Sequence, residues 1–183
     1  MFDTRSVRPI YFQVPVSAPS SILVGCTNKT VCVRVEGKGS FLNSSGLKEF
    51  SREMIQRGYR EFMIDFRNCP MMDSTFMGTL AGIAINLRGL GQGSVHVVQI
   101  NERNRDLLCN LGLDRLFTME PGTGAAFGEL NQKPLETEDA TDKAGRTQTM
   151  LEAHEALVAA DAANLAKFKD VLEYLKHDLH VGE

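Results

Sequence analysis

The 183-residue sequence has no apolar run near the ~18 residues that a membrane-spanning helix needs, so no membrane span is expected. Residues 1–14 scatter charge and proline through the region where a secretion signal would have its apolar core. The net charge is only -3, and no basic stripe with interleaved aromatic residues is present, so nucleic acid is not an expected partner. These absences predict a cytoplasmic globular protein.

Other chemistry is also missing from the sequence. No two cysteines form a Cys-x-x-Cys pair, and their apolar surroundings favour reduced, buried side chains at Cys26, Cys32, Cys69 and Cys109. His177 and His180 lie close together near the C-terminus without a third ligand, so no metal site is expected. No paired carboxylates and no nucleophile spaced for a base are evident. We therefore expect no enzyme and no cofactor.

Strand and helix patterns alternate through residues 20–120. The segments SILVGC and TVCVRVEG flank the turn TNK and predict a β-hairpin. After the hairpin, three helix patterns (44–58, 74–91 and 101–112) alternate with three strand patterns, 61–66, 94–100 and 114–119. Such alternation indicates parallel strands joined by crossover helices. The expected fold is one α/β domain with a mixed β-sheet flanked by α-helices.

The two ends of the chain differ from this domain. Residues 1–19 are expected to form an N-terminal arm, and residues 121–148, rich in Gly, Pro and Thr, a linker. Residues 149–181 contain no Gly or Pro and predict one long amphipathic C-terminal helix. Its apolar seam repeats every seven residues at Leu151, Val158, Leu165, Leu172 and Leu179. The seam could pack on the domain or pair with a second copy.

Three polar residues, Asp73, Ser74 and Thr75, stand between the strand FMIDF and the helix pattern that follows. In the simpler interpretation, Asp73 or Ser74 caps the helix and has no other role. In the second, Ser74 is a modification site, because a helix N-terminus tolerates the added charge of a phosphate. Asp65, at the end of FMIDF, either supports this loop or is a solvated carboxylate.

These motifs occur in a specific order. A strand ending in Asp65 is followed by the loop MMDST, by Gly78 and Leu80, and by GQGSVHVVQINERNRDLLCNLGLDRLF with its pair Gly112 and Leu113. The ordered set resembles the STAS domain, and more narrowly the anti-sigma-factor antagonists of bacteria. The resemblance covers residues 20–120 and leaves the C-terminal segment unexplained.

The resemblance implies a non-enzymatic switch in signal transduction and transcription regulation. A partner anti-sigma factor, itself a Ser/Thr kinase, would phosphorylate Ser74. The unphosphorylated form would bind that kinase and release the sigma factor, and a metal-dependent Ser/Thr phosphatase would reset the switch. The expected partner-binding residues are Asp73, Thr75, Phe76 and Met77. Phe76 departs from the family pattern, which usually has glycine there, and could anchor a different partner or crowd out a kinase.

A second hypothesis uses the same fold without modification. The chain would be a constitutive STAS-type scaffold or interaction subunit of a signalling or lipid-transport complex, and it would dimerise through the C-terminal helix. Phe76 and the seven-residue seam motivate this alternative, because both are expected of fixed contacts.

Overall fold

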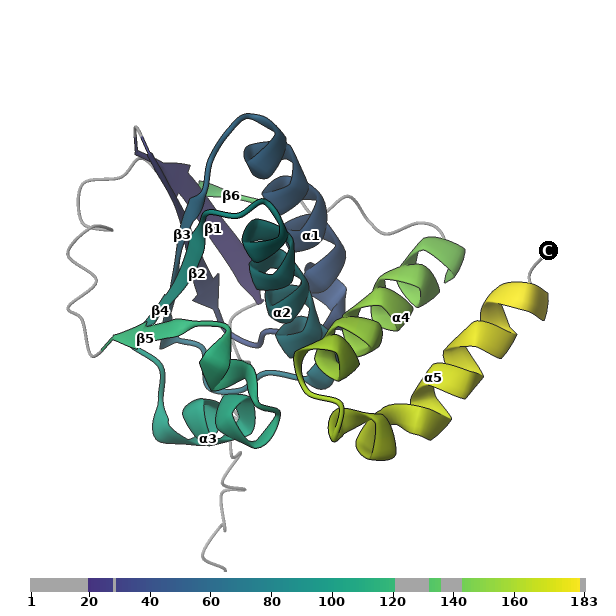
Figure 1. Ribbon diagram of the computed structural model, residues 1–183. Helices are drawn as coiled ribbons and strands as arrows, with labels where there is room; N and C mark the ends of the chain where they lie inside the picture. Colours follow the sequence, from purple (N-terminus) through teal and green to yellow (C-terminus); the bar gives the residue numbers. More distant parts are fainter. Residues whose placement is uncertain (1–19, 28, 121–131, 136–142, 182–183) are drawn as a thin grey trace, which may run out of the picture.

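The computed structural model describes residues 20–27, 29–120, 132–135 and 143–181. The predicted arm, residues 1–19, lies outside the described residues. Six strands form one sheet in the order β5-β4-β3-β2-β1-β6 (Figure 1): β1 (Ser21–Cys26), β2 (Thr30–Glu36), β3 (Glu61–Asn68), β4 (Ser94–Val98), β5 (Thr118–Glu120) and β6 (Lys133–Pro134). The helices are α1 (Phe41–Gln56), α2 (Ser74–Gly89), α3 (Glu102–Asn110), a short 3-10 turn (Leu113–Arg115), α4 (Lys143–Ala160) and α5 (Asn164–Val181).

The sheet is mixed, as the sequence predicts. β1 and β2 form the expected antiparallel hairpin, whereas β2, β3, β4 and β5 are parallel neighbours joined through helices. The last predicted strand is shorter than expected, because residues 113–115 form the 3-10 turn and the strand begins at Thr118. The predicted linker also contributes structure. Residues 133–134 pair with β1 as an edge strand, where Pro134 is tolerated because an edge strand leaves one side unpaired.

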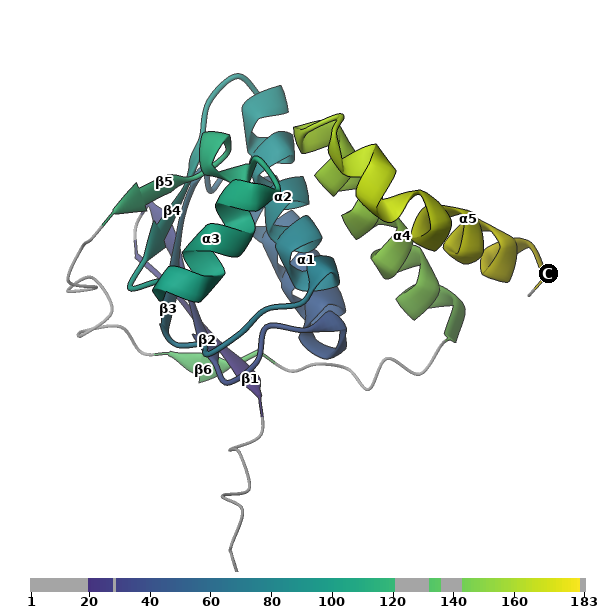
Figure 2. The same ribbon diagram turned by 90° about the horizontal axis from the view of Figure 1, so that it is seen from below.

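The hydrophobic core lies between one face of the sheet and helices α1, α2 and α3 (Figures 1 and 2). β3 shows how the sequence builds it, since successive side chains of a strand point to opposite faces. Phe62, Ile64 and Phe66 are fully buried against the helices. Among the described helices, none combines the length and the hydrophobicity that a membrane span requires.

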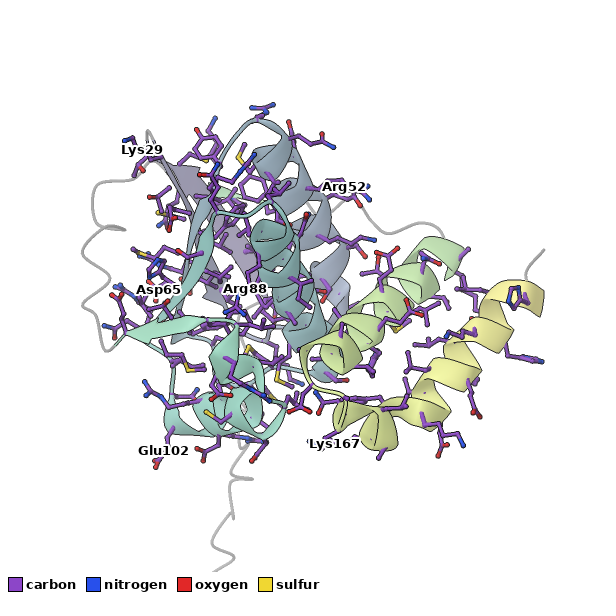
Figure 3. The ribbon with its side chains drawn as sticks, in the orientation of Figure 1. Lys29, Arg52, Asp65, Arg88, Glu102 and Lys167 are labelled. Atoms are coloured by element: carbon purple, nitrogen blue, oxygen red, sulfur yellow. The ribbon has the colours of Figure 1, made fainter. Side chains whose placement is uncertain are left out.

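Asp65 lies on the other face of β3, and neither prediction for it is correct. Its side chain is fully buried, and its Oδ2 atom accepts hydrogen bonds from the Nε atoms of Arg34 at 3.1 Å and Arg67 at 2.7 Å. The alternation of the strand points this carboxylate away from α2, so it cannot support the loop before that helix. Figure 3 shows it on the side of the sheet away from α1 and α2. Asp65 is a structural ion-pair centre.

All four cysteines are free, as expected, but only Cys32 and Cys69 are buried. Burial raises the pKa of Cys32 to about 11 and also raises that of Cys69, so both thiols stay protonated and unreactive at neutral pH. The prediction of burial is wrong for Cys26 and Cys109, which are exposed at the end of β1 and on the outer side of α3.

The C-terminal segment is helical, but it forms two helices instead of one. α4 begins at Lys143, inside the predicted linker, and ends at Ala160; α5 begins at Asn164. The turn between them is held by polar bonds to the domain and by bonds within the hairpin. The amide of Asn164, which is almost fully buried, donates to the backbone oxygens of Leu111 at 2.9 Å and Leu157 at 2.8 Å. The Asp161 side chain accepts from the Ala163 N–H at 2.9 Å and pairs with Arg115.

The seven-residue seam is used within the chain. Because α5 folds back along α4, the two halves of the seam face each other. Leu151 of α4 is buried with Leu172 and Leu175 of α5, and four partly buried residues surround them: Met150, Val158, Phe168 and Leu179. Leu165 lies next to the turn and is half exposed. The helical hairpin therefore satisfies its own seam in cis.

Candidate functional site

The site begins where Asp73 joins the N-termini of two helices. Its Oδ1 atom accepts the N–H of Phe76 at 2.9 Å and caps α2, as the simpler interpretation predicts. Its Oδ2 atom accepts the N–H of Phe41, at the start of α1, at 2.9 Å. Its own N–H donates to the Gly39 oxygen at 3.0 Å. One carboxylate thus fixes the corner formed by the β2–α1 and β3–α2 connections.

Ser74 is the first residue of α2 and is partly buried. Its Oγ atom lies 3.0 Å from Nε2 of His154, which is on α4 and only 4% exposed. Nδ1 of the same ring lies 2.8 Å from the carbonyl oxygen of Met150. A carbonyl only accepts, so we assign the proton of the neutral ring to Nδ1. Nε2 then accepts the hydrogen bond of the Ser74 hydroxyl group.

The serine–histidine pair is built as a contact between helices. The His154 ring packs in an edge-type arrangement with Phe168 of α5, with ring centroids 5.1 Å apart. The third partner of the ring is a backbone carbonyl in the same helix, where a catalytic triad would have a carboxylate. Sequence reasoning missed this bond. No local signal could have found it, because the two residues are 80 positions apart.

The other three predicted partner-binding residues lie beneath the corner. Thr75 and Met77 are each 5% exposed, and Phe76 has no exposed surface. The Phe76 ring lies directly over Gly39, where a Cβ atom would come within 2.6 Å of its Cδ1. Gly39 therefore makes room for the ring. These side chains shape the corner from inside and present almost no surface of their own.

Two exposed apolar residues border the corner instead. Phe41 and Leu42, in the first turn of α1, are 42% and 64% exposed. Phe41 is tied to the site through its backbone bond to Asp73. The sequence signal was present in the segment SFLNSS, where two large apolar residues begin a helix just ahead of its buried positions. Exposed apolar groups beside a polar corner are typical of protein-binding surfaces.

α4 is also tied to α1. The Nζ atom of Lys48 lies 2.7 Å from Oε2 of Glu152, and Ser45 donates to Thr149 at 3.3 Å. Burial works to raise the pKa of Glu152, but the hydrogen bonds from Lys48 and Gln148 outweigh it and hold the pKa below its usual value. The ion pair therefore stabilises the docked helix when Glu152 is ionised.

The stabilisation from the ion pair between Lys48 and Glu152 should depend on pH. Since the folded-state pKa is lowered, its stabilisation is present above the ordinary glutamate pKa of ~4.3 and is lost as the pH falls through the folded value. Glu152→Gln should lower the free energy of unfolding by about 1 kcal/mol or less at pH 7, because the pair is partly exposed.

Urea unfolding from pH 7 into acid measures this effect. The difference between the wild-type chain and E152Q should vanish in acid. Glu49→Gln, a change of an exposed α1 glutamate, should stay within about 0.5 kcal/mol of wild type at neutral pH. An E152Q difference that persists undiminished in acid contradicts the assignment.

Comparison with known proteins places this geometry in context. The family model of the STAS domain matches residues 21–126, so α4 and α5 lie outside the matched region. An anti-sigma factor antagonist from Mycobacterium paratuberculosis has a similar structure, with a TM-score of 0.52 and 23% identity over 61% of this chain and 96% of that chain. A Thermotoga maritima protein regarded as an anti-sigma factor antagonist gives a TM-score of 0.51 and 18% identity over 58% and 92%. No curated protein matches the sequence.

Proposed function

The chain belongs to the STAS domain family, and on that premise we propose that it is an anti-sigma-factor antagonist whose docking depends on phosphorylation of Ser74. The observation that carries the proposal is the place of Ser74 as the first residue of α2, directly after the capping carboxylate of Asp73. The free N–H groups and the dipole of a helix N-terminus accommodate added negative charge. The Mycobacterium protein of the same fold is named an anti-sigma factor antagonist.

The proposed partner is an anti-sigma factor that is also a Ser/Thr kinase. The γ-phosphoryl group of ATP would move to Ser74 Oγ, the hydroxyl proton would leave, and ADP would be released. A metal-dependent Ser/Thr phosphatase would hydrolyse the phosphoserine and return the hydroxyl group and inorganic phosphate. The chain itself acts by binding and needs no cofactor for this role.

The docking surface would consist of the corner at Asp73 and Ser74 with the exposed side chains of Phe41 and Leu42. A phosphate at this point adds about -1.5 to -2 charge beside an existing carboxylate and two apolar groups. A partner that recognises the neutral corner would therefore lose contacts when Ser74 is modified. Thr75, Phe76 and Met77 contribute by holding the corner in shape.

One observation favours the second candidate, a constitutive STAS-type scaffold. The Ser74 hydroxyl group is already engaged by His154, as expected of a serine with a purely structural role. The helical hairpin satisfies its apolar seam in cis, so the seam itself gives no reason to expect a dimer. A scaffold would keep the same affinity for its partner whatever group occupies position 74.

Binding to the partner isolated with the protein separates the two candidates. Mass spectrometry of the chain from its host should find phosphate on Ser74. Ser74→Asp should weaken binding of the co-purified partner by about tenfold or more, because it places charge at the docking corner. Thr118→Asp adds the same charge at an exposed position of β5 and should leave binding unchanged. An unmodified Ser74 together with full binding by S74D rules out the switch.

A further inference from the structure

The C-terminal hairpin covers the helix that begins with Ser74. Figures 1 and 2 show α4 beside α2, with α2 between the hairpin and the sheet. Leu157 of α4 is fully buried in the main core, and Ala153 is 3% exposed. The hairpin is thus packed against the domain through α4, while α5 lies farther from the sheet.

The approach of the two helices is closest one turn after Ser74. Gly78 has no side chain, and a Cβ atom there would lie 2.2 Å from the backbone oxygen of Ala153. The backbones of α2 and α4 are therefore in direct contact at this position. One turn further on the spacing is wider, since a Cβ atom on Gly82 would lie 3.8 Å from the Cβ of Ala156. The tightest part of the contact is the part next to Ser74.

A phosphate does not fit between these groups. Ser74 Oγ is already 3.0 Å from Nε2 of His154, a hydrogen-bond distance that leaves no space for a phosphorus atom and three oxygens. The lack of space therefore opposes the modified serine while α4 is in place.

We propose that the α4–α5 hairpin is an intramolecular cap on Ser74, and that the docked cap and phosphorylated Ser74 exclude each other. This inference rests on the proposed function, because it names the regulation of the same serine. A docked cap covers the hydroxyl group that a kinase must reach. Because the docked cap disfavours phosphoserine at position 74, phosphate on Ser74 must by reciprocity favour release of α4. The hairpin lies outside the matched STAS region, so this control is an addition to the family domain.

The attachments of the hairpin indicate how release occurs. At the turn, Asn164 is bound to Leu111, and Lys167 donates to the Asn110 oxygen at 2.7 Å (Figure 3). Along α4, the polar bonds to the domain are those of Ser74 with His154, Ser45 with Thr149 and Lys48 with Glu152. Release of α4 from Ser74 requires these three bonds to break, whereas the bonds of Asn164 and Lys167 can persist as an anchor at the turn.

Thiol labelling of S74C in the full chain tests the cap without any kinase. Iodoacetamide labelling at position 74 is followed on its own peptide by mass spectrometry, which separates it from the exposed Cys26 and Cys109. Gly78→Ala adds a methyl group that collides with α4 and leaves Ser74 untouched. S74C/G78A should label about tenfold faster than S74C. S74C/G82A is the control, because a methyl group at position 82 would make only an ordinary van der Waals contact with α4. It should label at the same rate as S74C.

Two further measurements keep the test decisive. If G78A alters the circular dichroism of the whole chain, S74C/H154A replaces it, since that variant removes the group over the serine without changing α2. Equal labelling rates in S74C, S74C/G78A and S74C/H154A overturn the cap. Because this test needs no kinase, a failure of the proposed phosphorylation in the host is recognised separately.

Hydrogen exchange tests the exclusion itself. With phosphoserine installed at position 74 by codon reassignment, the backbone amides of residues 147–160 should exchange about tenfold faster than in the unmodified chain. The amides of β2 and β3 serve as the internal control and should be unchanged. Unaltered protection of 147–160 in the phosphorylated chain overturns the proposal that phosphate and cap exclude each other.

Discussion

Replacing Phe76 by alanine should lower the free energy of unfolding by about 3–5 kcal/mol. The ring is fully buried in the main core and fills the space over Gly39, so its removal leaves a cavity that neighbouring backbone cannot close. Native domains have only ~5–15 kcal/mol of stability in total, so F76A would lose a large part of it. Urea unfolding followed by circular dichroism measures the change.

Phe41 provides the matched control. It is the same residue type at the same corner but 42% exposed. Phe41→Ala should change the free energy of unfolding by only about 0.5 kcal/mol, yet weaken partner binding. Comparing F76A with F41A thus separates a phenylalanine that supports the site from within the core from one that contacts the partner directly. A stable F76A chain with weakened binding would show that Phe76 acts as a surface anchor.

The sequence was informative where structure depends on local periodicity. The hairpin of β1 and β2, the parallel strands and their crossover helices all follow from alternating and helical patterns in residues 20–120. The cap at Asp73 was also predictable, because an aspartate just before an apolar helix satisfies N–H groups that lie three residues away. In each case the interacting groups are close in sequence, or the pattern itself defines the buried face.

The C-terminal segment shows where such reasoning stops. It contains no Gly or Pro that would end the helix, and the turn at 161–163 arises because Asn164 binds backbone oxygens of Leu111 and Leu157. Those bonds require the end of α3 to lie near Asn164, and the sequence periodicity of the C-terminal segment does not predict that tertiary contact. The contact between Ser74 and His154 has the same origin. Gly78 was noticed as part of a motif, but its physical role, admitting the backbone of α4, depends on a segment far along the chain.

Replacing Asp65 should also lower the free energy of unfolding by a large amount. Asp65→Ala removes the carboxylate that both Arg34 and Arg67 bind from the face of the sheet opposite the helices. The cost should be about 3 kcal/mol of unfolding free energy, the lower end for breaking a buried ion pair, because both guanidinium groups keep some contact with solvent. Asp106→Ala, at an exposed position of α3, should change the free energy of unfolding by about 0.5 kcal/mol or less.

The Asp65 carboxylate points away from α2, so its loss should not affect Ser74. At a low temperature where S74C/D65A remains folded, iodoacetamide should label Cys at position 74 at the same rate as in S74C. Faster labelling would mean that the ion-pair centre and the serine corner are coupled through β3.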